Sequence, residues 1–424
     1  MKLIKATAFI LFFTGIGTVC FGQMLQTSAY TPFHFEEPCD VRRQLADYIL
    51  SSAYIGRHAP EQIVFSDRTD TNVEFKIIES DNFFYQVLVP QYNGVYPLYS
   101  KGTYIIKRQI ENGEYVQVKV FLKSEASCFA RIFPRDDRSV LQVYLYGSKI
   151  GDDIILPVAF EDILFFPFDE IVGLTKNKLP WDIVWPEQSP LHDSVRLMTE
   201  RIEPHLSVLQ DEDDGALNSE GVFVYIETGE RQNAGGFNCS GFAKWVADGI
   251  YRKTHDSLLD IEALKQKHIG ERGNSFSIKY EDERDPYFGL DWTRNIASAL
   301  IDGDYEAADV RDAPFHKYTE DVGYRVKELQ GLLYQLAVRD PGRFYLGSVN
   351  LEFGSDPKLW QHVHVVVIFP YLTSDGRLTV KVMERNVETS LESLIERYPD
   401  GFIHLVYIEA EADYRPFEIV TRLE

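Results

Sequence analysis

The segment from Gly235 to Phe242 constrains this chain most, because it sets a cysteine between small residues at the start of a predicted helix. The apolar residues that follow have helical spacing and predict one buried face: Phe242, Trp245, Val246, Gly249 and Ile250. Cys239 would then lie at a helix N-terminus, where unpaired backbone N–H groups and the helix dipole favour thiolate over thiol. The alternative is a small buried residue packed at the helix start. The flanking glycines and Ser240 leave little to pack against, so we expect a reactive thiol.

The run Phe237-Asn238-Cys239-Ser240-Gly241-Phe242 resembles the Asp-Cys-Ser-Gly-Phe signature of NlpC-type cysteine peptidases. These are bacterial cell-wall hydrolases with a papain-like fold. In that family a tyrosine precedes the nucleophile in a segment that ends in glycines, and Tyr225 followed by Gly235-Gly236 matches this arrangement. The resemblance implies that Tyr225 and Ser240 contact the nucleophile or the substrate. Asn238 departs from the family pattern, which usually has Asp at this position.

A cysteine nucleophile needs a base, which usually lies far away in the sequence. The β-branched run Gln361–Phe369 predicts a strand and carries His362 and His364, with both histidines expected on one face. The second motif of the NlpC type is His-Val followed by hydrophobic residues on a core strand. His364 matches it best, because the four residues after it are all apolar, and His362 is the competing register.

The third member of the site follows from a predicted hairpin. Ser374-Asp375-Gly376 reads as a three-residue loop between the strand with the histidines and a second strand over 378–386. In that register Asn386 lies opposite His364, and its amide oxygen would hold the imidazole tautomer that leaves the other nitrogen free for the thiol. Glu384 shares the face of Asn386 and is the alternative if the register slips.

The N-terminus reads as a secretory leader. Lys2 and Lys5 precede an apolar run that continues to Gly22, so we predict a signal peptide over 1–22 and a mature chain without a transmembrane segment. Lipid attachment at Cys20 is the less favoured alternative, because Val19 is larger than the residue that such signals prefer. The expected location is exported, in the periplasm or outside the cell.

Charge and cysteine count bound the partners further. The formal net charge of −22 at pH 7 argues against nucleic acid as the principal partner, because phosphate binding needs clustered Lys and Arg. The mature chain would keep three cysteines. In an oxidising compartment Cys39 and Cys128 could pair, which would leave Cys239 free.

The predicted fold class is α+β. Alternating runs predict a β-rich N-terminal domain over 23–175 with one helix near 41–54, and its ligand is not apparent from the sequence. A linker with one helix near 191–202 follows over 176–221. The resemblance implies a papain-like catalytic domain over 222–424, with a long insertion at about 253–344 and closing strands at 345–351, 362–369, 378–386 and 402–408.

The resulting hypothesis is an exported cysteine hydrolase that cleaves an amide bond, with Cys239, His364 and Asn386 as the triad and no metal or organic cofactor. The resemblance implies that the substrate is a peptidoglycan stem peptide. Two alternatives remain open at this point. The same residues could transfer the acyl group to another amine or alcohol, or the chain could bind wall fragments without catalysis.

Overall fold

The computed structural model describes residues 37–268, 285–301, 303–353, 359–385 and 387–419. The described residues fall into two compact units, which divide between Glu187 and Gln188, and both units mix helices with antiparallel sheets. The chain is therefore α+β, as predicted. Over the described ranges, no helix has the length and apolar character needed to cross a membrane.

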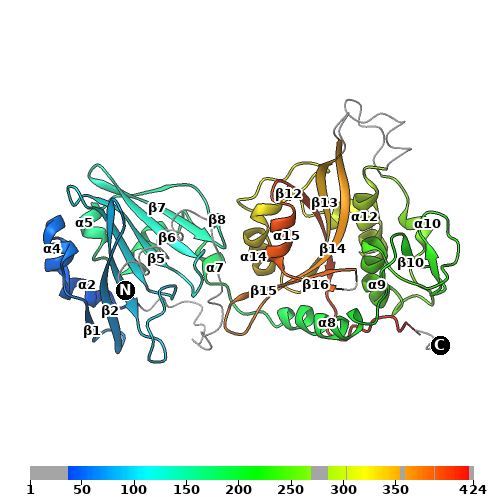
Figure 1. Cartoon of the computed structure of the whole chain (residues 1–424), viewed down its shortest axis with the longest axis horizontal. Coiled ribbons are helices and arrows are strands. Elements are labelled where there is room, and N and C mark those ends of the chain that lie inside the picture. The colour runs from blue at the N-terminus through cyan, green and yellow to red at the C-terminus, as the bar shows by residue number, and fades with distance from the viewer. Residues whose placement is uncertain (1–36, 269–284, 302, 354–358, 386, 420–424) are drawn as a thin grey trace. The chain divides into compact units, whose positions relative to one another are not determined.

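A nine-stranded antiparallel sheet forms the centre of the first unit (Figure 1). Strands β1 to β8 follow one another in sequence order, and β9 pairs with β7. Their bounds are β1 Gln62–Ser66, β2 Thr71–Glu79, β3 Phe83–Pro90, β4 Tyr104–Gln109, β5 Tyr115–Phe121, β6 Phe129–Arg135, β7 Arg138–Leu145, β8 Ser148–Lys149 and β9 Ile154–Leu156. Such a meander is built from short hairpins, which is what the alternating runs and their turns favour.

The helices of the first unit are short: α2 Cys39–Gln44, α3 Ala46–Ile49, α4 Ala53–Arg57, α5 Phe160–Ile163, α6 Phe168–Thr175 and α7 Trp181–Val184. The first three occupy the region where a single helix was expected, because the backbone leaves the helical conformation at Leu45 and again at Ser52. Cys39 and Cys128 are both buried free thiols, so the structure does not contain the disulfide considered between them.

The second unit contains a six-stranded antiparallel sheet in the order β12-β17-β13-β14-β15-β16. The bounds are β12 Tyr324–Arg325, β13 Arg343–Phe353, β14 Leu359–Leu372, β15 Leu378–Glu384, β16 Val387–Thr389 and β17 Phe402–Glu409. A separate pair is formed by β10 Gly215–Leu217 and β11 Phe223–Tyr225. The four long strands are those that the sequence predicts: β13 and β14 extend beyond the predicted ranges at both ends, β17 is one residue longer, and β15 ends at Glu384, two residues earlier than predicted.

Helices cover both faces of this sheet (Figure 1). One core cluster joins α8 Leu191–Leu206, α9 Cys239–Tyr251 and α12 Phe288–Ile301 to one face of β14. A second cluster joins α14 Leu329–Arg339 and α15 Leu391–Arg397 to the other face. The smaller helices are α10 Ile261–Leu264, α13 Tyr305–Ala308 and the 3-10 helix η1 Val326–Glu328.

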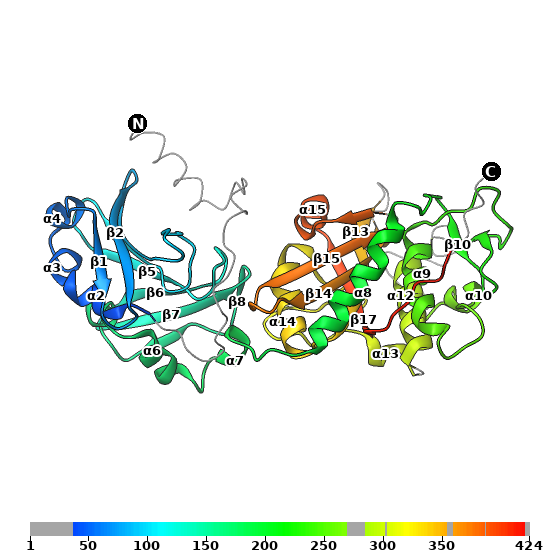
Figure 2. The ribbon, with the colours of Figure 1, turned by 90° about the horizontal axis from the view of Figure 1, so that it is seen from below.

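The helix that was expected in a linker belongs to the second unit. Val195, Met198 and Ile202 lie on one side of α8 at helical spacing and are fully buried in its core. Figure 2 shows α8 lying along the sheet, and its contacts with β14 place it there. An amphipathic helix becomes stable by burying its apolar side, so this segment packs as part of the fold.

The insertion also contributes to the core. Helix α12 packs on α9, and the Trp292 side chain is fully buried. Its indole N–H donates to the carbonyl oxygen of Ser240 at 2.9 Å. The described part of the insertion therefore supports the helix that begins at Cys239.

Candidate active site

Cys239 is the first residue of α9, and its side chain is only partly buried. The N-cap residue is Asn238, whose side-chain oxygen accepts a hydrogen bond from the Gly241 N–H at 2.7 Å. Asn caps a helix as well as Asp does, but it adds no negative charge beside the thiol. Asn238 therefore provides the cap without the charge repulsion by which an Asp here would disfavour the thiolate.

Gly241 is needed because the helix start lies directly against β10. A β-carbon at this position would lie 1.9 Å from the carbonyl oxygen of Gly215. The same carbonyl accepts a hydrogen bond from the Asn238 N–H at 3.0 Å. The small residues around Cys239 thus allow the backbone of β10 to fix the position of the nucleophile.

A β-bulge separates the two histidines of β14. Val349 of β13 pairs with His364, but the next residue, Asn350, pairs with His362, so Val363 is the extra residue. Consecutive residues of β13 point to opposite faces, and so do their partners. The expectation that both histidines share a face is therefore wrong.

His362 is buried and fully hydrogen-bonded. Its Nδ1 lies 2.9 Å from Ser348 Oγ, and its Nε2 lies 2.9 Å from Asn350 Nδ2 and 3.0 Å from the carbonyl oxygen of Asp321. This environment is that of a structural core histidine. His364, on the other face, is the one in contact with the Cys239 thiol.

The predicted hairpin register is confirmed. Pairs run from Leu372–Leu378 to Val367–Met383, and Gly376 has the positive φ of 75° that the loop needs. Asn386 lies outside the described residues. The side chain that meets His364 is Glu384, the alternative in the sequence analysis, whose Oε2 is hydrogen-bonded to Nε2 of the imidazole. Because Nε2 is bonded to Glu384, Nδ1 is the nitrogen that remains for the thiol.

Two arginines that the sequence did not indicate complete the surroundings. Arg397, at the end of α15, bonds the other carboxylate oxygen of Glu384. Arg385 follows β15, and its Nη1 lies 2.7 and 2.8 Å from the two carboxylate oxygens of Asp211. Neither arginine is part of a motif or of a periodic hydrophobic pattern, so their place beside the site is seen only in the tertiary structure.

Electrostatics at the site favour an ion pair between sulfur and imidazole. Burial raises the pKa of the Cys239 thiol, but the hydrogen bond and charge of His364, the Val365 N–H and the charge of Arg385 outweigh it, so the pKa is lowered. Burial lowers the pKa of His364, but the hydrogen bonds to Cys239 and Glu384 raise it to about 9. Burial also raises the pKa of Glu384, whereas His364 and Arg397 bring it below its ordinary value. These shifts favour the thiolate, the imidazolium and the carboxylate over the neutral forms of the three groups.

The two predicted contact residues lie close to the start of α9. Tyr225 of β11 pairs with Gly215 of β10, and the Gly215 carbonyl accepts a hydrogen bond from the Asn238 N–H. The side chain of Tyr225 is partly exposed. Ser240 is buried with 3% of its surface exposed, which makes a direct contact of its side chain with a substrate less favourable than the sequence suggested.

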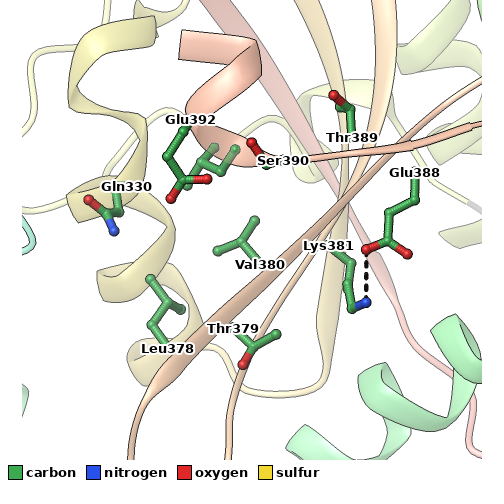
Figure 3. Close-up of a pocket in the computed structure, with 10 residues that line it drawn as sticks. Gln330, Leu378, Thr379, Val380, Lys381, Glu388, Thr389, Ser390 and Glu392 are labelled. Atoms are coloured by element: carbon green, nitrogen blue, oxygen red, sulfur yellow. Dashed lines mark hydrogen bonds and ion pairs between the residues drawn. The ribbon is translucent and has the colours of Figure 1, made fainter. Parts of the chain in front are cut away.

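A separate pocket lies between β15, β16, α14 and α15 (Figure 3). Its lining includes Leu378, Val380 and Leu391, and Lys381 forms an ion pair with Glu388 at 2.8 Å on its rim. It includes neither a cysteine nor a histidine, so it does not supply the chemistry of the Cys239 site. Across the part of the chain that the structure describes, no three His, Cys, Asp or Glu side chains converge to hold a metal ion.

Comparisons with known proteins concern the first unit. Residues 31–183 match a family described as a domain of unknown function, DUF8515. No curated protein and no solved structure matches the chain. The match includes all nine strands of the first sheet and ends before α8, so it does not reach the site around Cys239.

Proposed function

We propose that this protein is an exported cysteine hydrolase with a papain-like catalytic unit of the NlpC type, which cleaves an amide bond in peptidoglycan stem peptides. The observation that carries the proposal is the contact of Cys239, at a helix N-terminus, with His364, which is itself bonded to Glu384. A nucleophile, a base and a group that orients the base are the parts that such a reaction needs. The substrate class rests on the resemblance of the Cys239 motif.

In the proposed reaction, the Cys239 thiolate attacks the carbonyl carbon of the amide. The negative charge that develops on the carbonyl oxygen is stabilised by backbone N–H groups at the start of α9. The His364 imidazolium gives its proton to the leaving amine as the C–N bond breaks, and a thioester remains on Cys239. Neutral His364 then takes a proton from water, whose oxygen attacks the thioester. The acid product leaves, and the thiolate–imidazolium pair is restored.

Glu384 takes the role that the sequence analysis gave to Asn386. A carboxylate beside Nε2 favours the protonated imidazole and keeps Nδ1 directed to the sulfur. Stabilising the imidazolium also stabilises the thiolate, because the two charges attract each other. This arrangement supports a nucleophile that is ready to react at neutral pH.

The test combines thiol labelling with digestion of purified cell wall. Iodoacetamide at neutral pH should add one group to Cys239, detected by intact mass, and the wild-type protein should release new amino groups from the wall. Cys239→Ala and His364→Gln should release none. Release by Cys239→Ala, or a Cys239 that reacts no faster than free cysteine, contradicts the proposal. Including a competing amine separates hydrolysis from acyl transfer, because a transferase would yield the amine adduct.

A further inference from the structure

We propose that Arg397 is a positioning residue, which holds the Glu384 carboxylate in the orientation that supports His364. Arg397 is the last residue of α15, so this helix would support the site through Glu384. The catalytic role of Arg397 rests on the proposed function, whereas the bond between Arg397 and Glu384 and the titration that tests its effect do not.

The geometry divides the two oxygens of Glu384 between two partners. Oε2 meets Nε2 of His364, and Oε1 meets Nη2 of Arg397. The side chain of Glu384 is 6% exposed, so both oxygens need partners within the protein, whereas Arg397 is 45% exposed and keeps access to water. With one oxygen fixed by a guanidinium, the carboxylate cannot rotate away from the imidazole without losing a charged hydrogen bond.

The backbone around Glu384 does not fix its side chain alone. β15 ends at Glu384, and the next residue, Arg385, has a φ of 52°, which lies outside the strand conformation. Glu384 pairs with Val387 of β16 on one side only, because the pairs between β15 and β14 end at Met383. Arg397 provides the missing constraint from a different element.

Helix α15 is well placed to carry this constraint. Ser390 caps it by accepting a hydrogen bond from the Ser393 N–H at 3.0 Å, and Leu394 is fully buried against the sheet. Arg397 lies in the last turn, where the helix dipole favours a positive charge. The Tyr398 ring follows at once, with its centroid 6.3 Å from that of His364.

The charged and titratable groups that face His364 come from three elements. Cys239 of α9 and Glu384 of β15 contact it, and the Tyr398 ring lies beside it; Arg397 of α15 bonds Glu384, and the charge of Arg385 acts on Cys239. Two roles of Arg397 predict opposite results. As a remote positive charge alone, it destabilises the imidazolium, so its removal would raise the pKa of His364. As a positioning residue, it keeps the carboxylate on the imidazole, so its removal would lower that pKa.

The experiment is an NMR titration of the His364 ring in the mature protein with labelled histidine, the signal being assigned by its loss in His364→Gln. Arg397→Met should lower the His364 pKa by roughly 0.5 pH units, the size expected for a partly exposed ion pair. Arg397→Lys, which keeps the charge, should restore most of the difference. Arg196→Met is the matched control, because Arg196 of α8 is 39% exposed and also pairs with carboxylates. It should leave the titration unchanged.

A double variant tests whether Arg397 acts through Glu384. In a Glu384→Gln background, Arg397→Met should cause no further shift, because the group that it positions is gone. An unchanged or raised His364 pKa in Arg397→Met overturns the proposal, and so does an equal shift in both backgrounds. Where Arg397→Met does not fold, Arg397→Gln is titrated against the same criteria. The titration needs no turnover, so a wild-type protein that digests no wall would refute the proposed function while the result on Arg397 still stands.

Discussion

Gly241→Ala should destabilise the second unit, although alanine is the better helix former. In a free helix the exchange would gain about 1 kcal/mol. Here the new β-carbon would lie 1.9 Å from the Gly215 carbonyl oxygen, and a clash with the backbone cannot be relieved by a change of rotamer. Overpacking of this kind costs up to about 3 kcal/mol, so the net loss in the free energy of unfolding should be about 2 kcal/mol.

The same substitution should also slow the reaction of Cys239 with iodoacetamide, because α9 must move away from β10 and carry the thiol with it. Urea unfolding followed by circular dichroism, together with the alkylation rate, measures both effects. The control is Gly173→Ala in α6, where a β-carbon would meet nothing within 4 Å. That variant should gain about 0.5 to 1 kcal/mol in its own unit. A Gly241→Ala protein with wild-type stability and alkylation would refute the close-approach argument.

Further predictions concern the charged side chains. Glu384→Gln should move the alkaline limit of amide hydrolysis from about pH 9 down by about one unit, since His364 loses a negative partner and the imidazolium is needed to protonate the leaving amine; an unmoved limit in the pH–rate profile contradicts this role. His362→Ala should cost about 1 to 3 kcal/mol of stability, because Ser348 and Asn350 lose a buried partner, while Cys239 alkylation stays at the wild-type rate. A loss of alkylation without loss of stability would reverse the assignment of the two histidines. His364→Gln should slow alkylation of Cys239 at pH 7, because its hydrogen bond and charge lower the thiol pKa; an unchanged rate would show that the helix start alone activates the sulfur.

The helix at Cys239 and the strand at His364 could be predicted because both depend on local periodicity. The bulge at Val363 could not, since a strict alternation of two places His362 and His364 on one face. The hairpin register was predictable from the loop, but the choice of Glu384 as the partner of His364 was not. That choice depends on Arg397, which approaches from a helix that follows a further strand.

Packing between distant segments was equally hidden from the sequence. The indole of Trp292 meets the carbonyl of Ser240, and the apolar side of α8 covers β14. Each contact joins segments that no local pattern links. The sequence therefore predicts which residues form each element more readily than it predicts which elements pack together.

The end of β15 has a consequence for how this site can change. The last pair that joins β15 to β14 is Met383–Val367, and the N–H of Val365 donates to the sulfur of Cys239. The thiol thus occupies a position at which another strand residue would otherwise present its carbonyl. The left-handed backbone of Arg385 keeps β15 from growing into that place. A substitution that favours extended backbone at Arg385 would let β15 grow by a residue, and its carbonyl would then compete with the Cys239 sulfur for the N–H of Val365. A longer β15 would therefore make the thiol less reactive.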